Sequence, residues 1–173
     1  MKLLIANLGS TSFKYRLFDM STETQLAQGG IDRIGGEISD CFIVIGGVRS
    51  ETQAVIVDHS VAVQKCLDQL TDPSNGCLKS ATEVSGIGFK AVHGGSYSGV
   101  QLVTPDVLNE MELMGQAAPA HNPPYVSAMR LMGTQFPDLP LVAAFETGFH
   151  QTIADAQRYY ATPRKWADQF QVK

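Results

Sequence analysis

The sequence has few charged residues, and those it has are not gathered into runs. Aspartate, glutamate, lysine and arginine make up 17% of the 173 residues, below the roughly 25% of an average soluble domain. Thirteen basic and seventeen acidic side chains give a net charge of −4 without any basic stretch. Proteins that bind the phosphate backbone of nucleic acids need a basic patch, so we expect no nucleic-acid partner.

Long hydrophobic runs and paired cysteines are also missing. The longest apolar stretches, such as residues 139–145, are far shorter than the about 20 residues that cross a bilayer, so no membrane partner is expected. Three cysteines without a C-x-x-C pair argue against both a disulfide framework and a zinc site. The apolar run near the N-terminus is too brief for a signal peptide. These features predict a cytoplasmic protein with reduced thiols.

Strand patterns crowd the first third of the chain. An apolar run, a polar turn and an alternating segment predict a β-hairpin, which further strands extend as an antiparallel meander. The predicted strands of this part cover residues 2–7, 13–19, 25–31, 41–45 and 53–57.

Helices and strands alternate in the rest of the chain. Residues from 59 to about 71 have helical spacing, 104–116 begin with a capping threonine and a proline, and 125–133 follow a stiff proline-rich loop at 118–124. Strands are predicted at 87–92 and 139–145, whereas the remainder of the chain has no clear packing partner. Together the two parts predict an α/β domain with a mixed sheet.

Four polar segments stand at the ends of predicted strands or before a helix. NLGSTSFK (7–14) offers glycine, hydroxyls and a lysine that can cradle a phosphate, although it lacks the Walker pattern and also fits an ordinary hairpin turn. KAVHGG (90–95) combines a histidine with glycines that let a ligand approach the backbone. PAHNPP (119–124) holds two polar side chains between prolines, and FETGFHQ (145–151) places a carboxylate after a buried strand. Each of the last three also fits a purely structural role.

Taken together and in this order, these segments resemble the acetate kinase family of acyl-phosphate-forming kinases. The family patterns read N-x-G-S-S-S-x-K, H/F-R-V-V-H-G-G, A-P-L-H-N-P-P and F-D-T-A-F-H-Q. This sequence has NLGSTSFK, FKAVHGG, APAHNPP and FETGFHQ at the corresponding places. The match extends over nearly the whole chain.

The resemblance implies an actin-like ATPase fold, also described as ribonuclease H-like, that forms the N-terminal half of a two-domain kinase. Residues 1–150 would be the N-terminal domain and 151–173 the start of a truncated second, nucleotide-binding domain. Family members use ATP and Mg²⁺ to phosphorylate a short carboxylate such as acetate or propionate, giving an acyl phosphate and ADP. The resemblance also implies that the full-length enzyme is a homodimer.

The same resemblance assigns roles to nine residues. The catalytic positions are Glu146 and His121, and the carboxylate-binding positions are Lys90, Val92 and Ala120. The phosphate of ATP would lie near Asn7, Ser10, Ser12 and Lys14, with Asn7 also assigned to the metal.

Three of these positions depart from the family pattern. Lys90 replaces an arginine, which removes the planar fork that grips a carboxylate through two hydrogen bonds. Glu146 replaces an aspartate and moves the carboxylate outward by about one bond, and a misplacement near 1 Å can cost on the order of a hundredfold in rate. Ala120 replaces a leucine and enlarges the acyl pocket, so acids longer than acetate should be used at least comparably.

Family enzymes are more than twice as long, and their second domain supplies the adenine pocket and further charged groups. We therefore expect this chain alone to be incomplete for catalysis. The alternative is a diverged, non-catalytic domain that binds an anion or a partner. The low charge predicts an apolar face near Glu146 or the C-terminal segment, where a second domain would dock.

Overall fold

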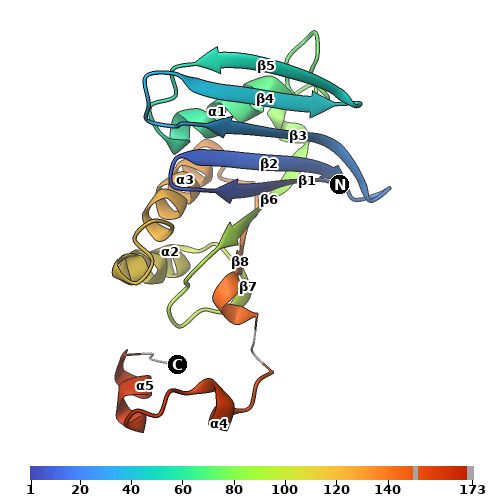
Figure 1. The fold of residues 1–173 in the computed structure, drawn as a ribbon. Helices are drawn as coiled ribbons and strands as arrows, with labels where there is room; N and C mark the ends of the chain where they lie inside the picture. The colour runs from blue at the N-terminus through green and yellow to red at the C-terminus, as the bar shows by residue number, and fades with distance from the viewer. Residues whose placement is uncertain (150–151, 171–173) are drawn as a thin grey trace.

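A mixed sheet of eight strands forms the centre of the molecule, and the helices that precede the last strand β8 lie on one face of it (Figure 1). The computed structural model describes residues 1–149 and 152–170. The strand order is β5-β4-β3-β2-β1-β6-β8-β7. The strands are β1 (Lys2–Leu8), β2 (Ser12–Asp19), β3 (Thr24–Asp32), β4 (Ser39–Ile45), β5 (Val48–Ala54), β6 (Val84–Ala91), β7 (Gly99–Leu102) and β8 (Leu141–Phe145). The helices are α1 (His59–Leu70), α2 (Pro105–Leu113), α3 (Asn122–Gln135), α4 (Asp155–Arg158) and α5 (Arg164–Phe170), with 3-10 turns at Ala81–Glu83, Met114–Gln116 and Glu146–Gly148.

The first five strands form the predicted antiparallel meander. The fifth strand was placed wrongly, because β5 begins at Val48 and not at residue 53. Gly46 and Gly47 both have positive φ and form a two-residue turn, so Ile45 pairs directly with Val48. The β5 side chains are mostly polar and exposed at the sheet edge, whereas the more apolar residues 55–57 that suggested a strand have no regular structure.

The second part of the sheet is parallel. β6 lies beside β1, β8 lies beside β6, and α1 makes the crossover from the meander to β6. The short edge strand β7 runs antiparallel to β8 and was not predicted, because four residues carry too little periodicity to detect. The mixed α/β sheet itself is confirmed.

Strand alternation decides which face the helices cover. Leu4, Ala6 and Leu8 of β1 are buried, whereas Ile5 and Asn7 between them are exposed. The same alternation continues in β2 and β6, and α1 and α3 pack on the buried side. The opposite face of the strands carries polar and charged side chains such as Asn7, Lys14 and Lys90 beside the apolar Ile5.

Helix α3 begins earlier than predicted. Its first residue is Asn122, so the proline-rich segment is partly helical rather than a loop. Pro123 and Pro124 fit there because the first turn of a helix has no acceptors for its backbone N–H groups. This earlier start places the side chains of Asn122 and Tyr125 near the carboxyl ends of β6 and β1.

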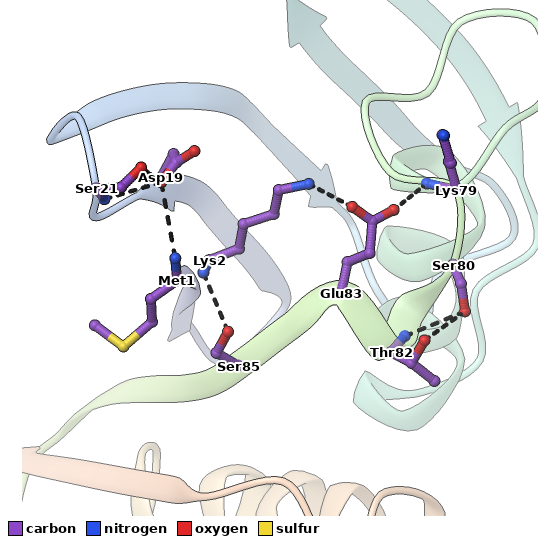
Figure 2. A network of polar contacts seen from close by, with 9 residues as sticks. All are labelled: Met1, Lys2, Asp19, Ser21, Lys79, Ser80, Thr82, Glu83 and Ser85. Carbon is purple, nitrogen blue, oxygen red and sulfur yellow. Dashed lines mark hydrogen bonds and ion pairs between the residues drawn. The ribbon is translucent and has the colours of Figure 1, made fainter.

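A polar network ties the N-terminus to the segment before β6 (Figure 2). Lys2 Nζ lies 2.5 Å from Glu83 Oε2, and the other oxygen of Glu83 accepts the Lys79 N–H at 2.5 Å. The Met1 amino group lies 3.9 Å from Asp19 Oδ1. Since β1 and β6 begin here, the network holds the sheet at the edge opposite to their carboxyl ends.

The C-terminal segment 152–170 holds the short helices α4 and α5, which lie beyond the β7–β8 end of the sheet in Figure 1. The Arg158 and Arg164 guanidinium groups lie 5.1 and 4.2 Å from the Tyr159 ring centroid. His150 and Gln151 of the fourth motif, and residues 171–173, lie outside the described residues. The domain boundary at residue 150 stays a prediction. None of the described helices is long and apolar enough to cross a membrane.

Candidate functional site

The carboxyl ends of three parallel strands meet at one edge of the sheet. β1 ends at Leu8, β6 at Ala91 and β8 at Phe145, and the first turn of α3 lies behind this edge. Ligands of open α/β sheets bind beyond the carboxyl ends of the strands. The topology therefore brings Asn7 and Glu146 to the same edge, although they are far apart in the sequence.

The turn between β1 and β2 is tightly built. The Gly9 N–H donates to the Ser12 carbonyl at 2.7 Å, and a Cβ on Gly9 would lie 2.5 Å from Ser12 Oγ. Only glycine fits there without displacing the Ser12 side chain. Ser10 is exposed and Ser12 is half-buried at this turn. Behind the turn, His59 Nε2 lies 2.8 Å from the Gly9 carbonyl oxygen, so α1 supports it.

Two of the predicted phosphate-binding residues share one face of the sheet. Asn7 on β1 is the cross-strand partner of Lys14 on β2, and both are exposed. Side chains opposite each other in antiparallel strands lie on the same face. Together with Arg16, Arg49 and other residues they line an open groove of about 480 Å³ that reaches Lys90 on β6.

Lys90 and Glu146 form an ion pair. Lys90 Nζ lies 3.0 Å from Glu146 Oε1, and both side chains are half-exposed. The Thr147 N–H donates to the Val92 carbonyl at 3.4 Å, which joins the turn after β8 to the end of β6. The two charged positions that depart from the family pattern are thus in direct contact.

The turn after β6 is held by a buried asparagine whose structural role the sequence did not reveal. Asn122 is fully buried, and its Nδ2 donates to the carbonyls of His93 at 2.8 Å and Met111 at 2.7 Å. Its Oδ1 accepts the His93 N–H at 3.4 Å. The Gly95 N–H donates to His93 Nδ1 at 3.0 Å, which leaves the ring proton of a neutral His93 on Nε2.

Three other predicted residues lie around this turn. Val92 directly follows β6 and is half-buried, whereas Ala120 and His121 are exposed immediately before α3. The His121 side chain makes no capping hydrogen bond to the helix. His121 therefore presents its imidazole at the surface, and its catalytic role stays a prediction, as does the acyl pocket of Val92 and Ala120.

Tyr125 reaches the site from α3 and was not predicted as a site residue. Its side chain is buried, its hydroxyl oxygen lies 3.0 Å from the Leu8 backbone nitrogen, and the same oxygen lies 3.1 Å from Asn7 Oδ1. Burial raises the pKa of Tyr125, so the phenol stays protonated. No local pattern marks this tyrosine, because its partners are 117 and 118 residues away.

Comparison with known structures shows that the fold is that of an actin-like ATPase domain. The chain matches a crystal structure of acetate kinase from Porphyromonas gingivalis with a TM-score of 0.88 and 32% identity, covering 97% of this chain and 43% of that one. It also matches a propionate kinase from Francisella tularensis with a TM-score of 0.86 and 26% identity, over 98% of this chain and 43% of that one.

The chain belongs to the Acetokinase family, whose model matches residues 2–173. It is 37% identical over 174 residues to an acetate kinase of Clostridium acetobutylicum, covering 100% of this chain and 43% of that protein. It is 38% identical over 173 residues to an acetate kinase of Bacillus cereus, covering 99% of this chain and 43% of that protein. The chain therefore spans less than half the length of the curated relatives it matches, and the expected family and fold are confirmed.

Proposed function

We propose that this chain is the phosphoryl- and carboxylate-binding portion of a kinase that reversibly transfers the γ-phosphoryl group of ATP to acetate or propionate. The observation that carries this is the meeting of Asn7, Lys90 and Glu146 at the carboxyl ends of β1, β6 and β8. Phosphoryl transfer needs positioning and neutralisation of charge more than covalent chemistry. Hydrogen-bond donors, cations and a carboxylate gathered at one edge of the sheet fit that need.

The two sides of the edge take different roles in this proposal. Ser10 in the β1–β2 turn and Ser12 and Lys14 at the start of β2 bind phosphate oxygens. Val92 and Ala120 line the side that accepts the acyl tail, while His121 and Glu146 act at the reacting centre. The Gly9 turn supports the phosphate role, because its tight geometry and its brace from His59 hold the hydroxyls in place.

Lys90 binds the substrate carboxylate as a single point charge in this proposal. Its ammonium group already contacts Glu146 at 3.0 Å, so an incoming carboxylate must share or replace that contact. Since lysine lacks the bidentate fork of arginine, orientation of the acid depends on the neighbouring groups. We expect weak discrimination among short acids, and a KM for the acid that falls when Lys90 is replaced by arginine.

Magnesium enters this proposal as part of the ATP substrate. Among the described residues no group of three or more histidine, cysteine, aspartate or glutamate side chains is placed to hold a metal. Mg²⁺ commonly binds through one or two carboxylates together with substrate phosphates. The Glu146 carboxylate is suited to bind Mg²⁺ in this way. Asn7 Oδ1 is less suited, because it already accepts a hydrogen bond from the Tyr125 hydroxyl.

A second domain is the partner that this proposal requires. Val100 and Leu102 on the edge strand β7 are exposed by 72% and 58%, and Val100 pairs with Ala144 on the strand that leads to Glu146. This exposed apolar pair supports a face near Glu146 at which a second domain docks. Homodimerisation and a cytoplasmic location remain part of the proposal.

The proposal requires a longer gene product in which a second domain follows this chain, and the test is a kinase assay on that product. Acetate, propionate and butyrate are compared with ATP and Mg²⁺, and acyl phosphate is trapped as the hydroxamate. We expect product from acetate and, because of Ala120, at least comparable product from propionate. Failure to form any acyl phosphate would falsify the proposal, and strict acetate preference would contradict the pocket argument.

The second candidate is a non-catalytic domain that binds an anion or a partner protein. The Lys90–Glu146 contact favours it, because two substituted residues that neutralise each other leave less charge for a substrate. Calorimetry with ATP, acetyl phosphate and short acids separates the two. The double variant Lys90→Arg with Glu146→Asp raises kinase activity only where the remaining site is intact.

A further inference from the structure

Tyr125 contacts the candidate site from the buried side of the sheet. It lies in the first turn of α3 with 2% of its surface exposed, and its hydroxyl meets both the Leu8 backbone and the Asn7 side chain. The hydroxyl is the end of an otherwise apolar, packed side chain, so its position is fixed by the core. Asn7, by contrast, is exposed at the end of β1.

The direction of these hydrogen bonds follows from the groups involved. The Leu8 N–H can only donate, so the Tyr125 oxygen accepts it at 3.0 Å. The single phenolic proton is then donated to Asn7 Oδ1 at 3.1 Å. Turning the Asn7 amide over would place its NH₂ group against the hydroxyl and leave the buried phenolic proton without that acceptor. Such an unpaired buried donor is costly, which fixes the amide orientation.

The amide group is planar, so its nitrogen points away from the atom that its oxygen faces. With Oδ1 held against the buried hydroxyl, the NH₂ group of Asn7 is directed away from the core. The cross-strand partner of Asn7 on the exposed face of the sheet is Lys14. Lys14 makes no ion pair within the part of the chain described. One hydrogen-bond donor and one cation thus share the rim of the groove.

We propose that Tyr125 is a positioning residue that fixes the Asn7 amide with its NH₂ group outward, so that Asn7 donates to an anionic oxygen bound between Asn7 and Lys14. The identification of that oxygen with a phosphoryl group rests on the proposed function. Asn7 acts here as a donor to the anion, and a metal-ligand role through Oδ1 is the competing outcome.

The first experiment compares two tyrosine variants of the 173-residue chain. Tyr125→Phe removes the hydroxyl that orients Asn7, and Tyr15→Phe removes another buried hydroxyl, which donates to Gln69 Oε1 at 2.8 Å. Inorganic phosphate and Mg²⁺ are added in separate titrations while the Asn7 side-chain NH₂ resonances are followed by NMR. Phosphate should shift these resonances in the parent chain and in Tyr15→Phe, whereas Tyr125→Phe should bind phosphate about fivefold more weakly, as expected for one hydrogen bond.

A second variant keeps the proposal testable if Tyr125→Phe does not fold. Asn7 is exposed, so Asn7→Asp should leave the fold intact while it replaces the donor NH₂ by a charged oxygen. Phosphate binding, followed at the Lys14 resonances, should fall by more than tenfold. A metal-ligand role predicts the opposite pattern, in which Asn7→Asp binds Mg²⁺ more tightly and Mg²⁺ alone shifts the Asn7 resonances of the parent chain.

Three results would overturn the proposal: no phosphate response at Asn7, equal phosphate affinity of the two tyrosine variants, or the metal-ligand pattern. None of these titrations requires turnover. If the longer gene product makes no acyl phosphate while Asn7 still responds to phosphate, the proposed function fails and the role of Tyr125 stands. If the longer gene product is an active kinase but Asn7 does not respond to phosphate, the proposed function stands and the role of Tyr125 fails.

Discussion

The candidate site is held in place by different means on its buried side, which faces the helices, and on its exposed side. On one side, neutral and buried groups fix the backbone: Asn122 joins the turn after β6 to α3, and Tyr125 joins α3 to the end of β1. On the other side, Lys90 and Glu146 meet as a charged pair with half of each side chain in solvent. The first side resembles the interior of the protein, and the second its surface.

This difference separates residues that shape the site from residues that are free to change partners. A buried amide with three hydrogen bonds leaves several groups unpaired when it is removed. A half-exposed ion pair contributes about 0–1 kcal/mol and can exchange its partner for a ligand at little cost. We therefore expect stability to depend on the neutral contacts, and ligand binding to depend on the charged ones.

Loss of the Asn122 side chain should have the largest effect on stability. Asn122→Ala leaves the half-buried carbonyl of His93 and the buried carbonyl of Met111 without their donor, so we expect the free energy of unfolding to fall by about 3 kcal/mol. Urea denaturation followed by circular dichroism measures this. Asn109→Ala is the matched control, because Asn109 is exposed and accepts only a long 3.4 Å contact from Arg130.

Asn109→Ala should change the same free energy by less than about 0.5 kcal/mol. Equal losses in the two asparagine variants would contradict the assignment of Asn122 as the brace of the site.

The contact between His59 and the Gly9 carbonyl should have a smaller effect. His59→Ala removes one half-buried hydrogen bond of 2.8 Å, so we expect a loss of about 1 kcal/mol and faster amide exchange at residues 9–12. His59→Gln keeps a donor and should recover part of the loss. His121→Ala, at an exposed histidine without a capping bond, should leave exchange in the turn unchanged. Unchanged exchange in His59→Ala would show that the turn does not need this support.

The charged pair should matter least for folding. Lys90→Met removes the ion pair with Glu146 but keeps most of the aliphatic stem. We therefore expect the free energy of unfolding to change by less than about 0.5 kcal/mol. The proposed function predicts that the same variant, in the longer gene product that it requires, raises the KM for the carboxylate while the KM for ATP changes little. A large loss of stability would place Lys90 with the structural residues and remove the distinction between the two sides.

The sequence predicted features that depend on neighbouring residues. Alternation in 13–19 and the glycine-containing turn at 9–12 indicated the first hairpin, and capping Thr104 with Pro105 indicated the start of α2. Each of these signals is contained in fewer than about ten residues, and local preferences agree with the final fold. Three of the motifs likewise put Asn7, Lys90 and Glu146 near the carboxyl ends of strands, whereas PAHNPP lies at the start of α3.

The contacts that brace the site were beyond local reasoning. Tyr125 and Asn7 are 118 residues apart, and Asn122 and His93 are 29 apart, so only the packing of α3 against the sheet brings them together. Asn122 was noticed as a polar side chain between prolines, but its complete burial depends on where the helix starts. The Lys90–Glu146 contact likewise needs the register of β6 beside β8.

Acid should weaken the charged contacts and leave the neutral contacts unchanged. The N-terminal network in Figure 2 is the best place to test this, because it contains carboxyl groups with lowered pKa values. The Lys2 ammonium group and the Lys79 N–H lower the pKa of Glu83, and the Ser21 side chain and backbone lower the pKa of Asp19. Both carboxyl groups therefore have a lower pKa in the folded state than in the unfolded one. Their contribution to stability is present above the ordinary carboxyl pKa near 4 and is lost as the pH falls through the lower folded values.

Glu83→Gln should therefore flatten the fall in stability below about pH 4, measured by urea denaturation across a pH series. Glu112→Gln, which removes an exposed ion pair with Arg130 outside this network, is the matched control and should leave that fall in place. The hydrogen bonds of Tyr125 and Asn122 involve no group that titrates in this range, so amide exchange at Leu8 and His93 should stay slow there relative to the N-terminal network. Simultaneous loosening of both regions would show that the two kinds of contact are not independent.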